Sequence, residues 1–283
     1  MFTFPSADGI EIHVRQWLPA AAPPRAVVQI AHGMGEHGGR YEALAAELTA
    51  LGYAVYANDH RGHGLSMHSR KGCLGADGWN RLVEDTARLS RLVRERHPGL
   101  PLVLLGHSLG SFAAQQHVLD HPGLADAVAL CGTAAVDHLL PDLAVAGSGT
   151  ALLGALNKAF QPARTPADWL TRDEATVDRY LADPLCGFSL DAAGLADLAC
   201  EARRLADPRE VPTRLPVYVF VGDQDPVNGG LVFSDVVVDR YRNAGLADVT
   251  YRIYPGARHE LLNETNRAEV SADLTAWLDR VTG

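Results

Sequence analysis

The sequence predicts an α/β fold in which a mostly parallel central sheet is flanked by helices and interrupted by a helical insertion. Short apolar runs alternate with amphipathic stretches along most of the chain, which is typical of parallel strands covered by helices on both faces. Apolar and polar residues alternate on either side of Asp8-Gly9, which predicts an antiparallel hairpin within residues 1–18. Residues 134–212 break this rhythm, because no clear strand pattern occurs there.

The elements expected after the hairpin follow in a regular order. Strands are expected at AVVQI 26–30, YAVYAN 53–58, LVLL 102–105, AVALC 127–131, VYVFV 217–221 and VTYRIY 249–254. Helices are expected from about Tyr41, over 79–96, after Leu109, near 230–244 and at the end of the chain. In the second of these, apolar side chains recur at helical spacing and form one buried stripe.

The insertion consists of helix-like segments, at Leu152, Leu153, Leu156 and Phe160, then over 173–182 and over 191–206, separated by prolines at positions 141, 162, 166 and 184. An insertion at the carboxyl edge of such a sheet would cover the site as a lid. We therefore divide the chain into a core of residues 1–133 and 213–283 and a helical cap of residues 134–212. The apolar residues 143–160 either form the packing core of this lid or an acyl-accepting wall that contacts lipid surfaces transiently.

Composition limits the classes of partner. The 283 residues carry a net charge of −9, and this acidic average field argues against a nucleic acid as partner. The four cysteines form no C-x-x-C pair, and the first residues lack a basic and apolar signal pattern, so a reduced, cytoplasmic setting is expected. The longest charge-free stretch, 143–157, is too short and too rich in small residues to span a bilayer. The oligomeric state is left open.

The most informative motif is GHSLG 106–110, which lies between a buried-type strand and a helix rich in small residues. In a G-x-S-x-G turn the serine is held in strained geometry, and the flanking glycines remove the clashes that so sharp a turn would cause. Ser108 is thus a candidate nucleophile. The backbone N–H of Leu109, at the start of the helix, would face a developing oxyanion.

A serine nucleophile needs a base and an acid, which follow it along the chain in this architecture. Four histidines come after Ser108, and only His259, in the loop after the last strand, is expected at the carboxyl edge of the sheet. The loop after VYVFV 217–221 offers two carboxylates, Asp223 and Asp225. Either could accept the histidine N–H and stabilise the imidazolium. Spacing alone leaves this choice open.

The sequence resembles the α/β-hydrolases of the monoacylglycerol lipase and lysophospholipase-like group, often labelled serine aminopeptidase S33-like. The matching stretches are HGMGEHGGRY 32–41, NDHRGHGLS 58–66, GHSLG 106–110, RYLADPLC 179–186, GDQDPV 222–227 and YPGARHELLNE 254–264. The resemblance implies an α/β-hydrolase fold, Ser108 as nucleophile, Asp225 as the acid and His259 as the base. It also implies that the backbone N–H of Met34 is the second oxyanion donor. Ser111 departs from relatives, which often have a second glycine there.

The loop after the first buried strand permits a competing interpretation. Gly33, Gly35 and Gly38 fit the dinucleotide fingerprint G-x-G-x-x-G, with Asp59 some twenty residues on. In a dinucleotide fold, however, the glycines lead straight into a helix whose N-terminus faces the phosphates. Here the helix is delayed to about Tyr41, a carboxylate (Glu36) lies in the loop, and a hairpin precedes the strand. We therefore expect the loop to serve an oxyanion, and Asp59 to anchor a turn.

The histidines His32, His37, His60 and His63 invite a metal interpretation. No H-E-x-x-H or comparable ligand spacing is present, so structural hydrogen bonding is the preferred interpretation. We expect no metal ion and no organic cofactor in the reaction.

The leading hypothesis is a serine ester hydrolase, and the resemblance implies single-chain lipid substrates, either monoacylglycerol or lysophospholipid. A carboxylesterase for short acyl or polyester substrates would use the same three residues. A peptidase is less favoured, because nothing marks a site for a free amino terminus. A catalytically silent binding protein and an NAD(P)-dependent protein are the remaining alternatives.

Overall fold

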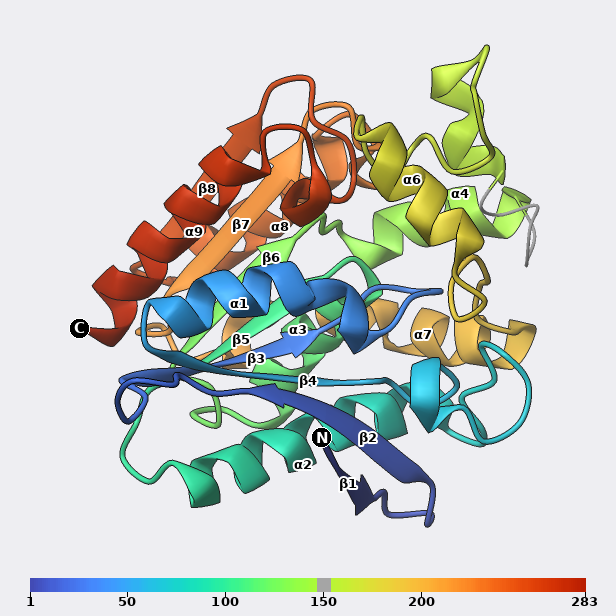
Figure 1. The fold of residues 1–283 in the computed structure, drawn as a ribbon. Helices are drawn as coiled ribbons and strands as arrows, with labels where there is room; N and C mark the ends of the chain where they lie inside the picture. The colour runs from blue at the N-terminus through green and yellow to red at the C-terminus, as the bar shows by residue number, and fades with distance from the viewer. Residues whose placement is uncertain (147–153) are drawn as a thin grey trace.

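The fold is built on one eight-stranded sheet with strand order β1-β2-β4-β3-β5-β6-β7-β8 (Figure 1). We describe it from a computed structural model covering residues 1–146 and 154–283, with side chains described up to residue 141 and again from residue 154. The strands are β1 (Phe2–Pro5), β2 (Glu11–Trp17), β3 (Ala26–Ala31), β4 (Tyr53–Asn58), β5 (Leu102–His107), β6 (Ala127–Cys131), β7 (Val217–Gly222) and β8 (Val249–Tyr254).

Strand direction follows the predicted pattern. The β1–β2 and β2–β4 pairs are antiparallel, whereas every other neighbouring pair is parallel. The strands from β3 to β7 are buried along their whole length, because helices cover both faces of the sheet and leave no polar face. The predicted fold class is confirmed.

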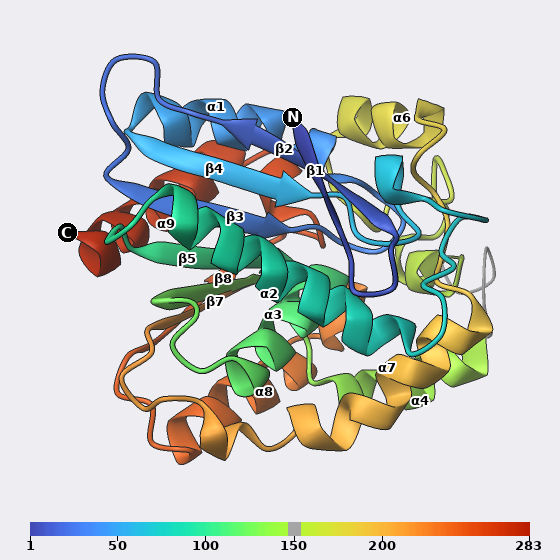
Figure 2. The same ribbon diagram turned by 90° about the horizontal axis from the view of Figure 1, so that it is seen from below.

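The helices form a layer on each face. They are α1 (Glu42–Ala50), α2 (Gly78–Arg96), α3 (Leu109–Asp120), α4 (Val136–Ala146), α6 (Glu174–Ala182), α7 (Ala192–Leu205), α8 (Val232–Asn243) and α9 (Arg267–Thr282). Helices α1 and α9 pack into one core cluster with side chains of β3, β4 and β7, while α2, α3 and α8 pack into another on the opposite face (Figure 2). This double covering excludes water from both sides of the parallel strands.

The N-terminal hairpin is fastened to the core through one buried cation. The Arg61 side chain is fully buried and donates to Asp85 of α2 at 2.8 Å and to Ser6 at 2.6 Å. It also donates to Asp8 at the hairpin turn, at 3.0 Å. A buried guanidinium is tolerated only when its donors are satisfied in this way. The pKa of Asp8 is accordingly lowered to about 2, chiefly by its hydrogen bond with Arg61.

The insertion between β6 and β7 contains α4, α6 and α7, which lie together at one end of the sheet (Figure 1). The helices predicted over 173–182 and 191–206 correspond to α6 and α7. Of the apolar stretch 143–160, Leu152 and Leu153 lie outside the described residues. Among the helices within residues 1–146 and 154–283, none has the length and apolar character needed to cross a bilayer.

Candidate active site

Ser108 occupies the sharp turn between β5 and α3. Its backbone has φ 51° and ψ −121°, a conformation that costs free energy in a residue with a side chain. The flanking glycines are required sterically. A Cβ on Gly106 would lie 2.4 Å from the carbonyl oxygen of Gly110, and a Cβ on Gly110 would lie 2.0 Å from that of Ala31. The predicted strained turn is therefore present, and it holds Ser108 at the carboxyl end of β5.

His259 and Asp225 form a buried hydrogen-bonded pair. The two loops that follow β8 and β7 bring His259 Nδ1 to 2.9 Å from Asp225 Oδ2, and both side chains are at most 2% exposed. The other oxygen of Asp225 accepts the N–H of Val227 at 2.8 Å. Asp223, in contrast, accepts the N–H of Gly256 at 2.7 Å and stabilises a turn. Spacing in the sequence left open whether Asp223 or Asp225 contacts the histidine, and in the structure the contact is made by Asp225.

The environment sets the charge preference of His259. Burial opposes protonation of the imidazole, but the negative charge of Asp225 and the hydrogen bond to it outweigh burial, so the pKa of His259 is raised above its usual value. The neighbouring His107 ring, 4.8 Å away between centroids, behaves in the opposite way. Burial, with a contribution from His259, lowers its pKa to about 4. His107 is therefore neutral near pH 7, and His259 is the more basic of the two.

Ser108 and His259 line the same cavity. The Ser108 N–H donates to the carbonyl of Cys131 at 2.9 Å, and the next residue, Gly132, packs so close to His259 that a Cβ there would lie 3.2 Å from its ring. The ends of β5 and β6 and the His259 loop thus meet at one edge of the sheet.

The cavity contains about 670 Å³ of empty space, part of it open to solvent, and its wall is mainly apolar. An apolar wall with a few polar groups is typical of small-molecule sites. The insertion supplies much of the wall through Leu139, Leu156, Trp169, Leu170, Tyr180, Leu195 and Leu198. The core supplies the polar groups and the insertion most of the apolar surface.

Two backbone N–H groups, of Met34 and Leu109, are available beside Ser108. Within the described part of the chain, neither donates a hydrogen bond. The loop that carries Met34 packs against the serine turn, since a Cβ on Gly33 would lie 3.3 Å from Ser108 Cβ. Both residues line the cavity. An oxygen bound between these groups would therefore lie next to the serine hydroxyl.

The glycine loop 33–38 does not have the form of a phosphate cradle. The Glu36 carboxylate fills it and accepts the Gly33 N–H at 2.5 Å and the Tyr41 hydroxyl at 2.8 Å. Asp59 accepts the N–H groups of Gly38 at 2.9 Å and Leu65 at 2.8 Å, as expected of a turn anchor. A carboxylate in the loop would repel a pyrophosphate, which argues against the dinucleotide interpretation.

A buried ion network at the cavity wall was not predicted from the sequence. Arg40 binds Glu260 through two nitrogens at 2.6 and 2.7 Å and Glu36 at 2.6 Å, with all three side chains at most 11% exposed. Glu36 belongs to the loop of Met34, and Glu260 follows His259. Arg40 therefore ties the donor loop to the histidine loop. The Glu-x-x-x-Arg spacing indicates the Glu36–Arg40 contact but not the contact with Glu260.

The insertion also contacts the histidine directly. The Trp169 ring lies 5.0 Å from the His259 ring between centroids, and the N–H of Glu260 donates to the carbonyl of Leu170 at 2.7 Å. Arg172 donates to Glu264 at 2.9 Å and extends this contact. No sequence signal marked Trp169, because its position depends on the path of the insertion.

The four histidines noted in the sequence divide into two groups. His32, His60 and His63 pack together at ring distances of 4.1–6.3 Å and are held by hydrogen bonds to backbone atoms. His37 lies apart from them, with Asp183 and Cys186. Among the described residues, these last three are the group whose side chains are spaced to share a metal ion, and none of them lines the cavity.

The fold and site together define an α/β-hydrolase, with a serine at a strained strand–helix turn and a buried histidine–carboxylate pair on the same cavity. The profile of the family described as serine aminopeptidase, S33 matches residues 22–266. The chain belongs to this family, as the sequence resemblance predicted.

Named relatives extend over nearly the whole chain. The monoacylglycerol lipase of Mycolicibacterium smegmatis is 34% identical over 281 residues, covering 98% of this chain and 95% of the relative. The human monoglyceride lipase is 28% identical over 288 residues, covering 98% and 89%. The crystal structure of a thermostable carboxyl esterase from Bacillus coagulans in complex with glycerol superimposes with a TM-score of 0.84 at 28% identity, covering 100% and 98%.

Proposed function

We propose that the chain is a serine carboxylic-ester hydrolase that acts through an acyl-enzyme on single-chain lipid esters, either monoacylglycerol or lysophospholipid. The observation that carries this proposal is the His259–Asp225 hydrogen bond of 2.9 Å on the wall of the apolar cavity that Ser108 also lines. No other arrangement within the described residues combines a strained serine, a histidine and a buried carboxylate.

In the proposed mechanism, Ser108 Oγ attacks the ester carbonyl while His259 takes its proton as general base. The N–H groups of Met34 and Leu109 stabilise the negative oxygen of the tetrahedral intermediate. His259, held and charge-stabilised by Asp225, gives the proton to the leaving alcohol. Water activated by the same histidine then cleaves the acyl-enzyme. Every group is supplied by the chain, so the mechanism requires no metal or cofactor.

The substrate class is inferred from the cavity and the relatives. Leucine side chains of the insertion form an apolar wall opposite polar core residues, which suits an acyl chain with a hydrolysable ester at one end. We assign residues 134–212 as the cap that forms this wall. The names of the bacterial and human relatives favour a glycerol monoester.

A carboxylesterase for short acyl chains is the second candidate, favoured by the high structural similarity to the Bacillus coagulans carboxyl esterase. Rates across p-nitrophenyl esters from C2 to C16, measured beside a monoacylglycerol and a lysophospholipid, separate the two. A maximum at long chains with monoacylglycerol turnover supports the lipase assignment. A maximum at C2–C4 without monoacylglycerol turnover would replace it.

The catalytic assignment is tested by substitution. Ser108→Ala should lower kcat by about 10⁶-fold and abolish labelling by a fluorophosphonate, since the nucleophile is removed. Asp225→Asn should reduce kcat far more than Asp223→Asn, because Asp223 only stabilises a turn. Wild-type turnover by Ser108→Ala would refute the nucleophile, and the reverse order of the aspartate variants would transfer the acid role to Asp223. Absence of any esterase activity in the wild type would leave a binding protein as the assignment.

A further inference from the structure

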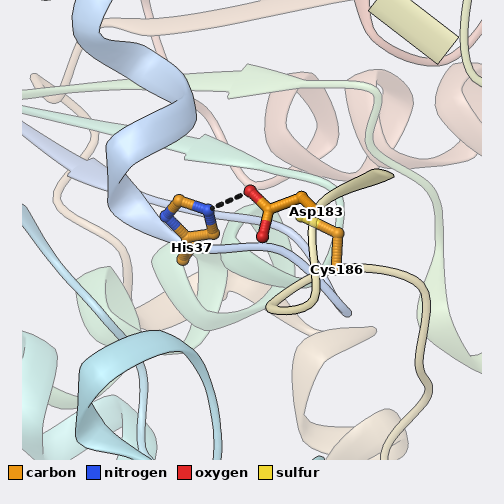
Figure 3. A group of neighbouring side chains, drawn as sticks. All are labelled: His37, Asp183 and Cys186. Carbon is orange, nitrogen blue, oxygen red and sulfur yellow. Dashed lines mark hydrogen bonds and ion pairs between the residues drawn. The ribbon is translucent and has the colours of Figure 1, made fainter. Parts of the chain in front are cut away.

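A second cluster of reactive side chains lies where the insertion meets the core. His37 belongs to the loop between β3 and α1, whereas Asp183 and Cys186 follow α6 in the insertion. His37 Nε2 lies 3.0 Å from Asp183 Oδ2, and one ligand atom from each of the three residues lies within 4.8 Å of the others. Figure 3 shows the imidazole facing the carboxylate, with Cys186 beside Asp183 on the same loop.

We propose that His37, Asp183 and Cys186 form a binding site for one thiophilic divalent cation of the Zn²⁺ type, through Nε2, a carboxylate oxygen and Sγ. Imidazole, carboxylate and thiolate are the ligands that Zn²⁺ takes in proteins, whereas Mg²⁺ and Ca²⁺ prefer oxygen alone. In a tetrahedral zinc site the ligand atoms lie about 3.3–3.8 Å apart. The nitrogen and oxygen already lie close together, and the sulfur needs to approach by about 1 Å.

The charges of the ligand set suit a divalent ion. One thiolate, one carboxylate and one neutral imidazole bring the complex to zero net charge, which lowers the cost of placing it in a partly buried site. Cys186 is buried, and burial raises the pKa of its thiol. The free thiol is therefore protonated, and metal binding releases that proton to solvent as the metal–sulfur bond forms.

The hydrogen bonds of His37 indicate what binding would change. Its Nδ1 accepts the Gly39 N–H at 3.1 Å, so the ring proton is on Nε2 and points at Asp183. A metal at Nε2 takes the place of that proton, which moves to Nδ1, and the hydrogen bond from Gly39 is lost. The site thus exchanges two hydrogen bonds, His37–Asp183 and Gly39–His37, for three metal–ligand bonds.

The ion would have access from solvent. The Asp183 side chain is 30% exposed, and both His37 and Asp183 line a surface depression distinct from the cavity of Ser108. Solvent in this depression can supply the fourth ligand, as in zinc sites with three protein ligands. Arg40, whose charge favours the Cys186 thiolate, is held by Glu36 and Glu260.

Binding would fix the junction between insertion and core. Gly187 N donates to the carbonyl of Gly35 at 3.0 Å, and a Cβ on Gly35 would lie 2.1 Å from the carbonyl oxygen of Phe188. The segment that carries Asp183 and Cys186 is therefore packed against the loop of Met34. An ion bound here would join the two segments and raise the melting temperature.

The test uses the full chain, freed of metal and then titrated with Zn²⁺ by calorimetry and with Co²⁺ by absorption. We expect one Zn²⁺ per chain, a near-ultraviolet thiolate-to-Co²⁺ band, a higher Tm with Zn²⁺, and no binding of Mg²⁺ or Ca²⁺. Cys186→Ser should abolish the band and the Tm shift. Asp183→Asn, which keeps the acceptor for the Leu185 N–H, should weaken Zn²⁺ binding by about tenfold or more.

Cys200→Ser is the matched control, because Cys200 is an exposed cysteine on α7 outside the cluster. Its band and Zn²⁺ affinity should equal those of the wild type. The proposal is overturned by a cobalt band that persists in Cys186→Ser or disappears in Cys200→Ser, or by a wild type that binds no Zn²⁺ below millimolar concentration. Should Cys186→Ser fail to fold, an unchanged affinity in Asp183→Asn would overturn it equally.

Discussion

At the scale of single residues, the charge state of His259 controls the pH dependence expected of the enzyme. Asp225 raises the pKa of the imidazole against the effect of burial, and the base must be neutral to accept a proton. Activity should therefore rise with pH through a pKa above 6.5, the usual value for histidine.

Asp225→Asn tests this dependence. The substitution removes the negative charge, so kcat should fall by about 10⁴-fold and the remaining activity should titrate at lower pH than in the wild type. The measurement is kcat/KM for a p-nitrophenyl ester from pH 5 to 9. If kcat/KM of Asp225→Asn rises with pH at the same pH as in the wild type, Asp225 does not set the pKa of His259.

The stability of the site should depend strongly on Arg40. It neutralises two buried carboxylates, and burial acts to raise the pKa of Glu36, but the charge of Arg40 together with the hydrogen bonds from Gly33 and Tyr41 holds that pKa at about 2. Arg40→Met would leave both carboxylates buried without a positive charge beside them, which should lower the free energy of unfolding by about 3–5 kcal/mol at pH 7. Urea denaturation measures this loss.

The pH dependence of that loss gives a second check. Without Arg40, the hydrogen bonds from Gly33 and Tyr41 remain, but burial is opposed less and the pKa of Glu36 rises above its wild-type value. Acid then protonates the carboxylate and relieves the uncompensated charge. The difference in stability between variant and wild type should shrink from pH 7 to pH 5. Arg91→Met is the control, because its ion pair with Glu84 is almost half exposed and worth less than about 1 kcal/mol. Equal losses in the two variants would refute a special role for Arg40.

At the scale of elements, the turn from β5 to α3 depends on close backbone approach. Gly110→Ala should yield no folded protein, because its Cβ would lie 2.0 Å from the Ala31 carbonyl oxygen and separate α3 from β3. Ser111→Ala, one residue further, should fold and lose about 1–3 kcal/mol, the cost of removing hydrogen bonds to Thr133 and to the Ser108 carbonyl. Soluble yield and circular dichroism distinguish these outcomes, and a well-folded Gly110→Ala would contradict the steric argument.

At the scale of the whole molecule, the core provides the reactive groups and the insertion most of the apolar wall. Leu195 of α7 lines the cavity and is only partly buried. Leu195→Trp should fill space that a long acyl chain needs, and so lower kcat/KM for C12–C16 esters by about tenfold while leaving C2 esters within about twofold.

The matched control is Leu181→Trp, because Leu181 lies on α6 of the same insertion but is 44% exposed and outside the cavity wall. Its chain-length profile should equal that of the wild type. A uniform loss across all chain lengths in Leu195→Trp would show that α7 supports the reactive groups rather than the acyl chain.

Much of this fold could be predicted from local patterns. The buried strands are continuous apolar runs, and the serine turn lies between a strand and a helix that are both recognisable by period. The helix expected from about Tyr41 begins at Glu42, after a short 3₁₀ turn at Gly38–Tyr41. These features depend on residues close together in the chain, so the sequence displays them directly.

The remaining parts of the site depend on contacts between distant residues. Arg40 and Glu260 are 220 positions apart, and no local pattern in either segment predicts their contact. The contact of Trp169 with His259 depends on the course of the whole insertion. The choice between Asp223 and Asp225 also required the loop conformation, in which Asn228 donates to the carbonyl of Gly222 at 2.8 Å.

The attachment of the insertion to the histidine loop has a consequence for engineering. The N–H of Glu260 donates a hydrogen bond to the carbonyl of Leu170, and the Arg258 side chain donates to the carbonyl of Asp168. Arg172 in turn donates to the carboxylate of Glu264. A chimera that exchanged only the cap for that of another hydrolase would discard half of each of these contacts. Grafting a new specificity onto this scaffold therefore calls for moving residues 258–264 together with the cap, as one transplanted unit.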